Sequence, residues 1–173
     1  MEGSRLIATE KIIAVSSPGC ENQVEDIRHW ASERGIGFLA IETGENFEEV
    51  KSEWEGGVVG ITIGGDGTFL EGARIFSPRR IPFIGVGSGT LSFLARVEPE
   101  GIFDALEEVL AGESKIDERQ RVSIKIDSFE AEGLNEVVIG HIWPKKPIER
   151  KISSIDVFVE GEHVGKYEGT GVA

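Results

Sequence analysis

Short apolar runs alternate with amphipathic stretches through the first two thirds of the chain. The runs are rich in Val and Ile and have the length of buried strands; they cover 11–15, 38–41, 58–63 and 81–86. Between and after them, apolar residues recur with the spacing of one helix face; these stretches cover 24–35, 46–54, 69–76 and 99–112. Strands that alternate with helices predict a parallel sheet covered by helices.

A different pattern begins near residue 119. Residues 121–127 and 155–159 alternate apolar and polar side chains, as half-buried antiparallel strands do, and we expect further strands at 134–139 and 163–173. No helical stretch lies between them. We therefore predict an α/β domain at 1–118 and, at 119–173, the start of an all-β, sandwich-like domain. Four strands leave an open edge, so we expect this second domain to be incomplete within the chain.

A glycine-rich turn, Gly64-Gly65-Asp66-Gly67-Thr68, follows the predicted strand at 58–63 directly and precedes a predicted helix. A strand that turns sharply into a helix presents free backbone N–H groups, which suit a phosphate. Asp66 would repel an anion, so it fits better as a hydrogen-bond acceptor for a hydroxyl beside that phosphate. The combination points to phosphoryl transfer onto an alcohol. The alternative stays open, because Gly-rich turns are common and Asp is an ordinary turn and N-cap residue.

Other nucleotide motifs fit less well. The chain has no G-x-x-x-x-G-K-[ST] segment, which argues against a P-loop enzyme. A second glycine-rich turn at 85–90 departs from the dinucleotide fingerprint because its last position is Thr90. The turns at 64–68 and 85–90 both follow predicted strands, and ligands of parallel sheets bind at that end.

Charge and composition exclude several classes of partner. The net charge of −13 argues against nucleic acid, which needs basic patches. No apolar run approaches the ~18 residues of a membrane span. Cys20 is the only cysteine, so no internal disulfide can form, and we expect a reducing, cytoplasmic location. The three histidines lack metal-ligand spacing, so we expect no metal held by the protein alone.

Three segments in order resemble the NAD kinase family. Residues 64–70, Gly-Gly-Asp-Gly-Thr-Phe-Leu, look like its signature turn; residues 82–94 are similar to its P-x-x-G-x-N-x-G-x-L-G-F-L segment; and residues 133–138 are similar to its A-L-N-E-V-V strand. Lipid kinases share the first turn but lack the Leu-Asn-Glu strand, so they rank second. The resemblance implies an α/β nucleotide domain followed by a β-rich domain, in agreement with the pattern above.

The resemblance also implies an activity, which is phosphorylation of the adenosine ribose 2′-hydroxyl of NAD to give NADP. ATP with Mg²⁺, or polyphosphate, would donate the phosphoryl group. Asp66 would be the proton acceptor at the ribose hydroxyl. The residues implied to contact the nucleotides are Gly64, Gly65, Gly67, Thr68, Phe69, Asn135, Glu136, Lys151, Lys166 and Glu168. Family members are homo-oligomers, so we expect a dimer or tetramer and no membrane or nucleic-acid partner.

The sequence also departs from the family pattern. Gly87 stands where the family has Asn, Ser92 where it has Gly, and Glu168 where it has Asp. The chain stops at Ala173, where the family's Thr-rich, Gly-Ser-Thr-containing NAD segment would begin. Two hypotheses therefore remain open: an active NAD kinase, and a nucleotide-binding or oligomer-forming remnant without turnover.

Overall fold

The computed structural model describes residues 9–45, 56–88, 92–140, 153–169 and 171–172. The chain divides into two compact units, Met1–Arg119 and Gln120–Ala173. Each unit is described by itself.

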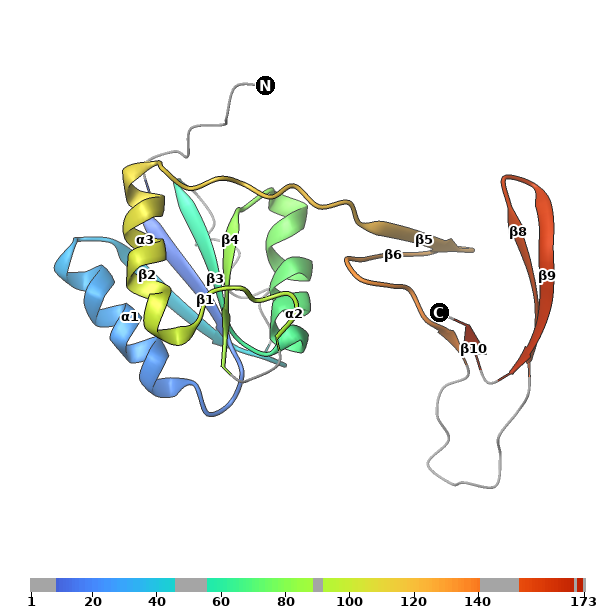
Figure 1. Ribbon diagram of the computed structural model, residues 1–173, viewed down its shortest axis with the longest axis horizontal. Helices are drawn as coiled ribbons and strands as arrows, with labels where there is room; N and C mark the ends of the chain where they lie inside the picture. Colours follow the sequence, from blue (N-terminus) through green and yellow to red (C-terminus); the bar gives the residue numbers. More distant parts are fainter. Residues whose placement is uncertain (1–8, 46–55, 89–91, 141–152, 170, 173) are drawn as a thin grey trace. The chain divides into compact units, whose positions relative to one another are not determined.

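The first unit contains a four-stranded, entirely parallel sheet. Its strands are β1 (Lys11–Ser16), β2 (Gly37–Glu42), β3 (Val58–Gly64) and β4 (Phe83–Gly87), in the order β2-β1-β3-β4 (Figure 1). Every residue of β3 is buried. The parallel sheet confirms the fold class predicted from the alternation of strands and helices.

Helices cover both faces of this sheet (Figure 1). One face packs against α1 (Glu21–Glu33) and α3 (Ile102–Ala111), which continues from a 3₁₀ turn, η3 (Pro99–Gly101). The other packs against α2 (Asp66–Phe76), which continues into a 3₁₀ turn, η2 (Ser77–Arg79). The helix predicted at 46–54 lies outside the described residues. The core side chains are Ile12, Ala14, Val24, Ile27, Trp30, Ile61, Ile63, Val86 and Leu106 on the first face, and Ile13, Val15, Ile41, Ile75 and Phe76 on the second.

Two glycines let α2 approach the sheet closely. A Cβ atom on Gly60 of β3 would lie 2.7 Å from the Phe76 ring. A Cβ atom on Gly72 of α2 would overlap the methyl group of Thr62. Because heavy atoms do not pack so closely, only glycine allows this spacing of helix and strand. The second half of α2 is thereby held directly against β3.

The second unit consists of paired strands without a buried core. Strands β5 (Val122–Ile126) and β6 (Phe129–Gly133) form one antiparallel hairpin, and β8 (Ser153–Val159) and β9 (Glu162–Gly169) form another. The short strands β7 (Ile139–Gly140) and β10 (Gly171–Val172) pair with each other. Among the described residues after Arg119, none is buried.

The strand predicted at 134–139 is largely wrong. Residues 134–138 have no regular structure, and only Ile139–Gly140 pairs as a strand. The partner of β5 is instead β6, which the sequence analysis did not predict. The reason is the two-residue turn between Ile126 and Phe129, in which Asp127 adopts a φ of 51° and returns the chain at once along β5. Residues 134–138 then pair with no strand among the described residues.

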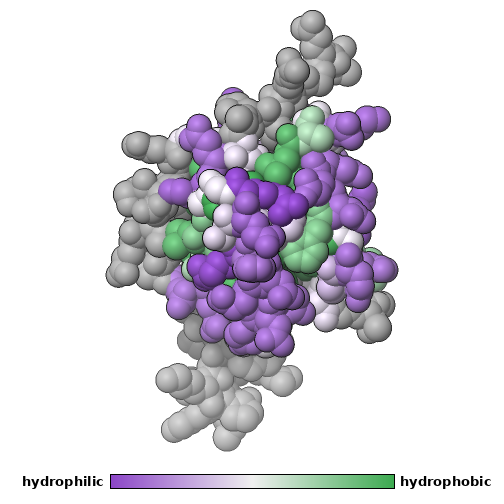
Figure 2. Space-filling view, turned by 90° about the vertical axis from the view of Figure 1, so that its left-hand side faces the viewer, coloured by the Kyte–Doolittle hydropathy of each residue, from purple (hydrophilic) through white to green (hydrophobic). Residues whose placement is uncertain are grey.

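The described surface is mainly hydrophilic on one face of the molecule, and hydrophobic residues form small patches there (Figure 2). No described helix has both the length and the apolar character that crossing a membrane would require.

Candidate active site

Three parallel strands bring their carboxyl ends together at one edge of the sheet. The Ser17 N–H, just after β1, donates to the Ile63 carbonyl at 2.9 Å. The Ser88 N–H, just after β4, donates to the Gly64 carbonyl at 3.2 Å. The glycine-rich turn that follows β3 therefore lies between the segments that follow β1 and β4.

Gly64 permits the chain to turn from β3 into α2. Its φ of 156° is a conformation that side chains disfavour, and a Cβ atom there would lie 2.8 Å from the Ser17 hydroxyl. By contrast, a Cβ atom on Gly65 or Gly67 would meet no atom of the described residues within 4 Å. The outer side of the turn is therefore open, next to the amino end of α2, where free N–H groups and the helix dipole attract anions.

Asp66, the first residue of α2, binds the segment that follows β4. Its Oδ1 atom accepts hydrogen bonds from the Ser92 hydroxyl at 2.8 Å and from the N–H groups of Phe93 and Leu94, both at 3.0 Å. Its Oδ2 atom accepts one longer bond, at 3.2 Å, from the Phe93 N–H. The carboxylate therefore joins two turns that are more than twenty residues apart in the sequence.

These hydrogen bonds hold Asp66 in its ionised form. The Leu94 N–H lowers the pKa of the Asp66 carboxyl most, followed by the Ser92 hydroxyl, while partial burial opposes them and the Phe93 and Ala95 N–H groups add to the lowering. All of these causes are neutral donors or burial, and none is a charged side chain. Asp66 is thus a carboxylate at neutral pH, suited to accept a hydrogen bond from a hydroxyl.

The segment that Asp66 binds is itself attached to β4. The Gly87 N–H donates to the Val97 carbonyl at 2.9 Å, and the Val97 N–H donates to the Gly85 carbonyl at 3.1 Å. Residues 92–97 therefore return alongside β4, and the three donors to Asp66 are fixed by the sheet.

The other predicted residues of the turn have different environments. Gly65 and Gly67 are exposed on the open side, whereas Thr68 and Phe69 are buried. The Phe69 ring packs on Phe83, with ring centres 4.9 Å apart. The Phe69 side chain thus packs the beginning of α2 against β4.

The remaining predicted residues belong to the second unit or lie outside the described residues. Asn135 and Glu136 are exposed. Lys166 and Glu168 are exposed on β9, two residues apart, so they share one face of the hairpin. Lys151 lies outside the described residues. The structure describes the two units separately, and the role of these four described residues at a site stays a prediction.

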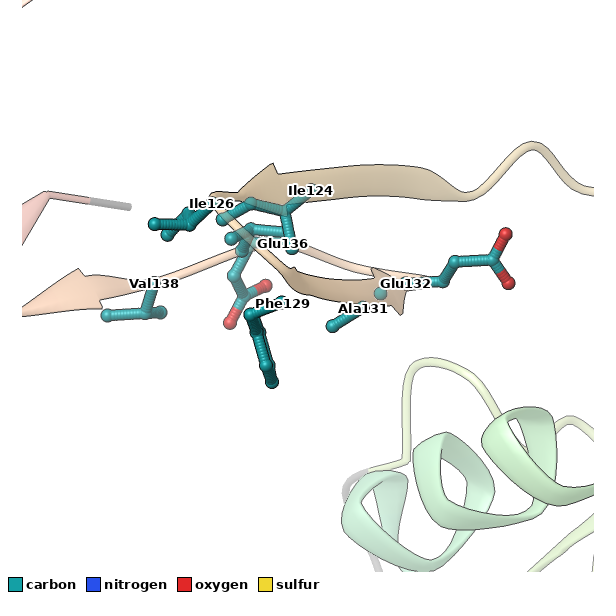
Figure 3. Close-up of a pocket in the computed structure, with 9 residues that line it drawn as sticks. Ile124, Ile126, Phe129, Ala131, Glu132, Glu136 and Val138 are labelled. Carbon is teal, nitrogen blue, oxygen red and sulfur yellow. The ribbon is translucent and has the colours of Figure 1, made fainter.

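Glu136 lines a hollow of the second unit, beneath the β5–β6 hairpin. The hollow has a volume of about 410 Å³, and Figure 3 shows the side chains around it. Most of its lining is apolar, including Ile124, Phe129 and Val137. Glu136 is therefore a charged group at the border of an apolar surface.

Two features of the site escaped the sequence analysis. Ser92 and the N–H groups after it bind Asp66, and Phe93, whose N–H is one of these donors, is 82% exposed. The sequence marked 92–94 only as part of a motif. An exposed aromatic side chain has no signal in the sequence, since Phe is usually a core residue.

Metal ligands are not gathered in the described ranges. Within them, no three His, Cys, Asp or Glu side chains are grouped so that they could hold a metal ion.

Comparisons with known proteins place the chain in a family. Residues 19–114, more than half of the chain, match the family model described as "ATP-NAD kinase N-terminal domain". An NAD kinase of Methanothermobacter thermautotrophicus is 40% identical over 100 residues, which are 58% of this chain and 35% of that protein. An NAD kinase of Fusobacterium nucleatum is 34% identical over 112 residues, which are 65% of this chain and 40% of that protein.

A solved structure agrees on the fold. The chain is similar to the crystal structure of yeast NADH kinase complexed with NADH, with a TM-score of 0.67 at 17% identity, over 95% of this chain and 56% of that one. The chain spans 35 to 40% of the length of the two curated relatives. On the family match over residues 19–114, this chain belongs to the NAD kinase family.

Proposed function

We propose that this chain carries the phosphoryl-transfer half of an NAD kinase site, which phosphorylates the adenosine ribose 2′-hydroxyl of NAD to give NADP. The observation that supports the proposal best is the ionised Asp66 carboxylate, which lies between the exposed glycines Gly65 and Gly67 of the turn. The ribose hydroxyl donates a hydrogen bond to Asp66, and its oxygen attacks the terminal phosphorus of ATP or polyphosphate. The bond to the leaving phosphate breaks, and the hydroxyl proton passes to Asp66 and then to solvent.

The phosphoryl donor binds at the open side of the turn. Gly65 and Gly67 are exposed, and a Cβ atom on either would meet no described atom within 4 Å, which supports close approach of phosphate oxygens to this turn. Positioning and neutralisation of phosphate charge supply most of the catalysis in phosphoryl transfer. Mg²⁺ arrives with ATP and supplies part of that neutralisation.

We also propose that residues of the second unit bind NAD. Asn135 and Glu136 bind the hydroxyls of the NAD sugar, and Lys166 and Glu168, with Lys151, contribute charged groups. Exposure of the four described side chains supports this proposal, because each is free of the protein core and open to a ligand. Alanine at Asn135 raises the KM for NAD if the proposal holds, and an unchanged KM would remove that residue from the site.

We further propose that the protein is a cytoplasmic homo-oligomer, a dimer or a tetramer. Large apolar side chains of the second unit are exposed, including Phe129, Val138 and Phe158. Burying such side chains against another copy would gain free energy. Light scattering at high concentration checks the mass, and a monomer throughout would contradict this part.

The experiment that tests the activity is NADP formation from NAD, ATP and Mg²⁺ by the wild type and by Asp66→Asn. The Asn oxygen can still accept hydrogen bonds from residues 92–94, so the variant should fold, but it cannot accept a proton. We expect NADP formation by the wild type and its loss in the variant. Asp26→Asn, at an exposed position of α1, is the matched control and should keep full activity. Turnover retained by Asp66→Asn would remove the assigned role.

A second candidate is nucleotide binding without turnover. It is favoured by the fact that Asp66 already accepts four hydrogen bonds from the protein, as a purely structural carboxylate would. Calorimetry distinguishes the two candidates. NAD binding by both the wild type and Asp66→Asn, with no NADP from either, would favour the second.

A further inference from the structure

The two oxygens of the Asp66 carboxylate accept different numbers of hydrogen bonds. Oδ1 accepts three hydrogen bonds, at 2.8, 3.0 and 3.0 Å. From the residues that the structure describes, Oδ2 accepts only the longer branch of the Phe93 bond, at 3.2 Å. A carboxylate oxygen has about two lone-pair sites, so Oδ1 is fully used and Oδ2 can accept another hydrogen bond. If the proposed function is right, Oδ2 is the atom left for the substrate hydroxyl.

Ser92 is the side chain responsible for this inequality. Within the described ranges, it is the one side chain that hydrogen-bonds Asp66; the other donors are backbone N–H groups. Its hydroxyl donates to Oδ1 at 2.8 Å and accepts the Ala95 N–H at 3.0 Å. Because both the donor and the acceptor of the hydroxyl are used, its orientation is fixed.

Ser92 is also a position where this chain departs from the family pattern. It lies next to Gly87, which is another such position. A Cβ atom on Gly87 would lie 3.5 Å from the Ser92 Cβ, in ordinary contact. Where the family pattern has Asn at 87 and Gly at 92, this chain has the side chain at 92 and none at 87. The missing side chain at Gly87 leaves room beside Ser92.

We propose that Ser92 is a positioning residue of the phosphoryl-transfer site, which saturates Oδ1 of Asp66 and so directs Oδ2 toward the substrate hydroxyl. This inference rests on the proposed function for its substrate, but not for the contact itself. Ser92 acts only through Asp66 and touches no reacting atom.

The contact is tested first without turnover. The Asp66 carboxyl is titrated by carbon NMR in the intact chain, and the signal is assigned as the one that Asp66→Asn removes. We expect Ser92→Ala and Ser92→Gly to raise the pKa of Asp66, because each removes a donor that favours the ionised form. Ser92→Thr keeps the hydroxyl and should restore the wild-type titration. Ser32→Ala, at an exposed position of α1, is the control for loss of a serine and should change nothing.

The role in the reaction is tested by the pH profile of NADP formation. Loss of the Ser92 hydroxyl should lower kcat about tenfold with little change in the KM for NAD, since it alters orientation rather than binding. The acid limb of the profile should move to higher pH in Ser92→Ala and return in Ser92→Thr. If Ser92 were only structural, its loss would lower the free energy of unfolding and leave the acid limb of the pH profile in place.

The outcomes separate this inference from the proposed function. An Asp66 titration that is the same in Ser92→Ala as in the wild type, in chains that both unfold cooperatively, overturns the inference whatever the activity. A raised pKa with unchanged kcat and acid limb overturns the role in catalysis. Turnover retained by Asp66→Asn, together with an Asp66 titration that responds to Ser92, overturns the proposed function alone.

Discussion

Asp66 couples the protonation of one carboxyl to the stability of the fold. Its pKa is lowered below the ordinary value of 3.8 because the ionised form accepts hydrogen bonds from Leu94, Ser92 and Phe93. The unfolded chain lacks these bonds and therefore binds a proton at higher pH than the folded chain. The resulting stabilisation is fully present well above pH 3.8 and is lost as the pH falls through the lower, folded-state pKa.

We therefore expect the free energy of unfolding of the wild type to fall more steeply on acidification than that of Asp66→Asn, which has no carboxyl to protonate. Urea unfolding between neutral pH and pH 3 measures the difference. The Asp26→Asn chain, which loses an exposed carboxyl with no hydrogen bond to a turn, should follow the wild type. Parallel curves for the wild type and Asp66→Asn would contradict the assigned hydrogen bonds.

Which residues bind Asp66 could not be predicted from the sequence. The sequence placed Asp66 in a strand-to-helix turn, and this placement agrees with the structure. Of the second glycine turn predicted at 85–90, residues 85–87 are the end of β4, and 89–90 lie outside the described residues. The sequence could not show that the carboxylate accepts from 92–94, because such contacts depend on how the chain returns along β4. A contact between segments distant in sequence leaves no local pattern.

At the scale of elements, the junction of α2 with β3 depends on glycine where helix and strand touch. Gly72→Ala would place a Cβ atom against the Thr62 methyl group, in a fully buried position. We expect the free energy of unfolding to fall by about 1–3 kcal/mol, the usual cost of overpacking, although Ala favours a helix. Thermal or urea unfolding measures this loss.

Gly67→Ala is the matched control on the same helix. A Cβ atom there would meet nothing within 4 Å, so the better helix propensity of Ala should raise the stability by up to about 1 kcal/mol. Equal stability changes in the two variants would show that the close contact at Gly72 does not limit packing.

Elements of the first unit were more predictable than those of the second. Strands β1, β2, β3 and β4 and helices α1, α2 and α3 match the predicted segments because each has an apolar face or run that the sheet buries. In the second unit, residues 134–138 have the composition of a strand but no partner, whereas the glutamate-rich β6 pairs because a tight turn brings it beside β5. Pairing of exposed strands depends on turns and register rather than on burial, so composition misleads there.

At the scale of the whole molecule, burial is confined to one of the two units. All described buried side chains lie between Ile12 and Val109. The free energy of local unfolding is larger where more apolar contacts are buried, so the first unit should be locally more stable than the second. We expect the backbone amides of β1 and β3 to exchange with solvent far more slowly than those of β5, β6, β8 and β9.

Hydrogen exchange followed by NMR or mass spectrometry measures this difference residue by residue. The amides of residues 116–120, which have no regular structure, provide an internal reference for weakly protected backbone. Equal protection of β1 and β8 would contradict the expectation and would show that the second unit is covered in solution. The oligomer proposed above predicts that such added protection rises with protein concentration.

The bond network of Asp66 also has a consequence for the thermodynamics of ligand binding. Residues 92–95 are already fixed before any nucleotide arrives, by one carboxylate and by the pairing of Val97 with β4. A loop ordered in advance spares the ligand the loss of conformational entropy that ordering would cost, about 1–2 kcal/mol for each residue's backbone. In a calorimetric comparison, weakening this network should therefore make the entropy of nucleotide binding less favourable.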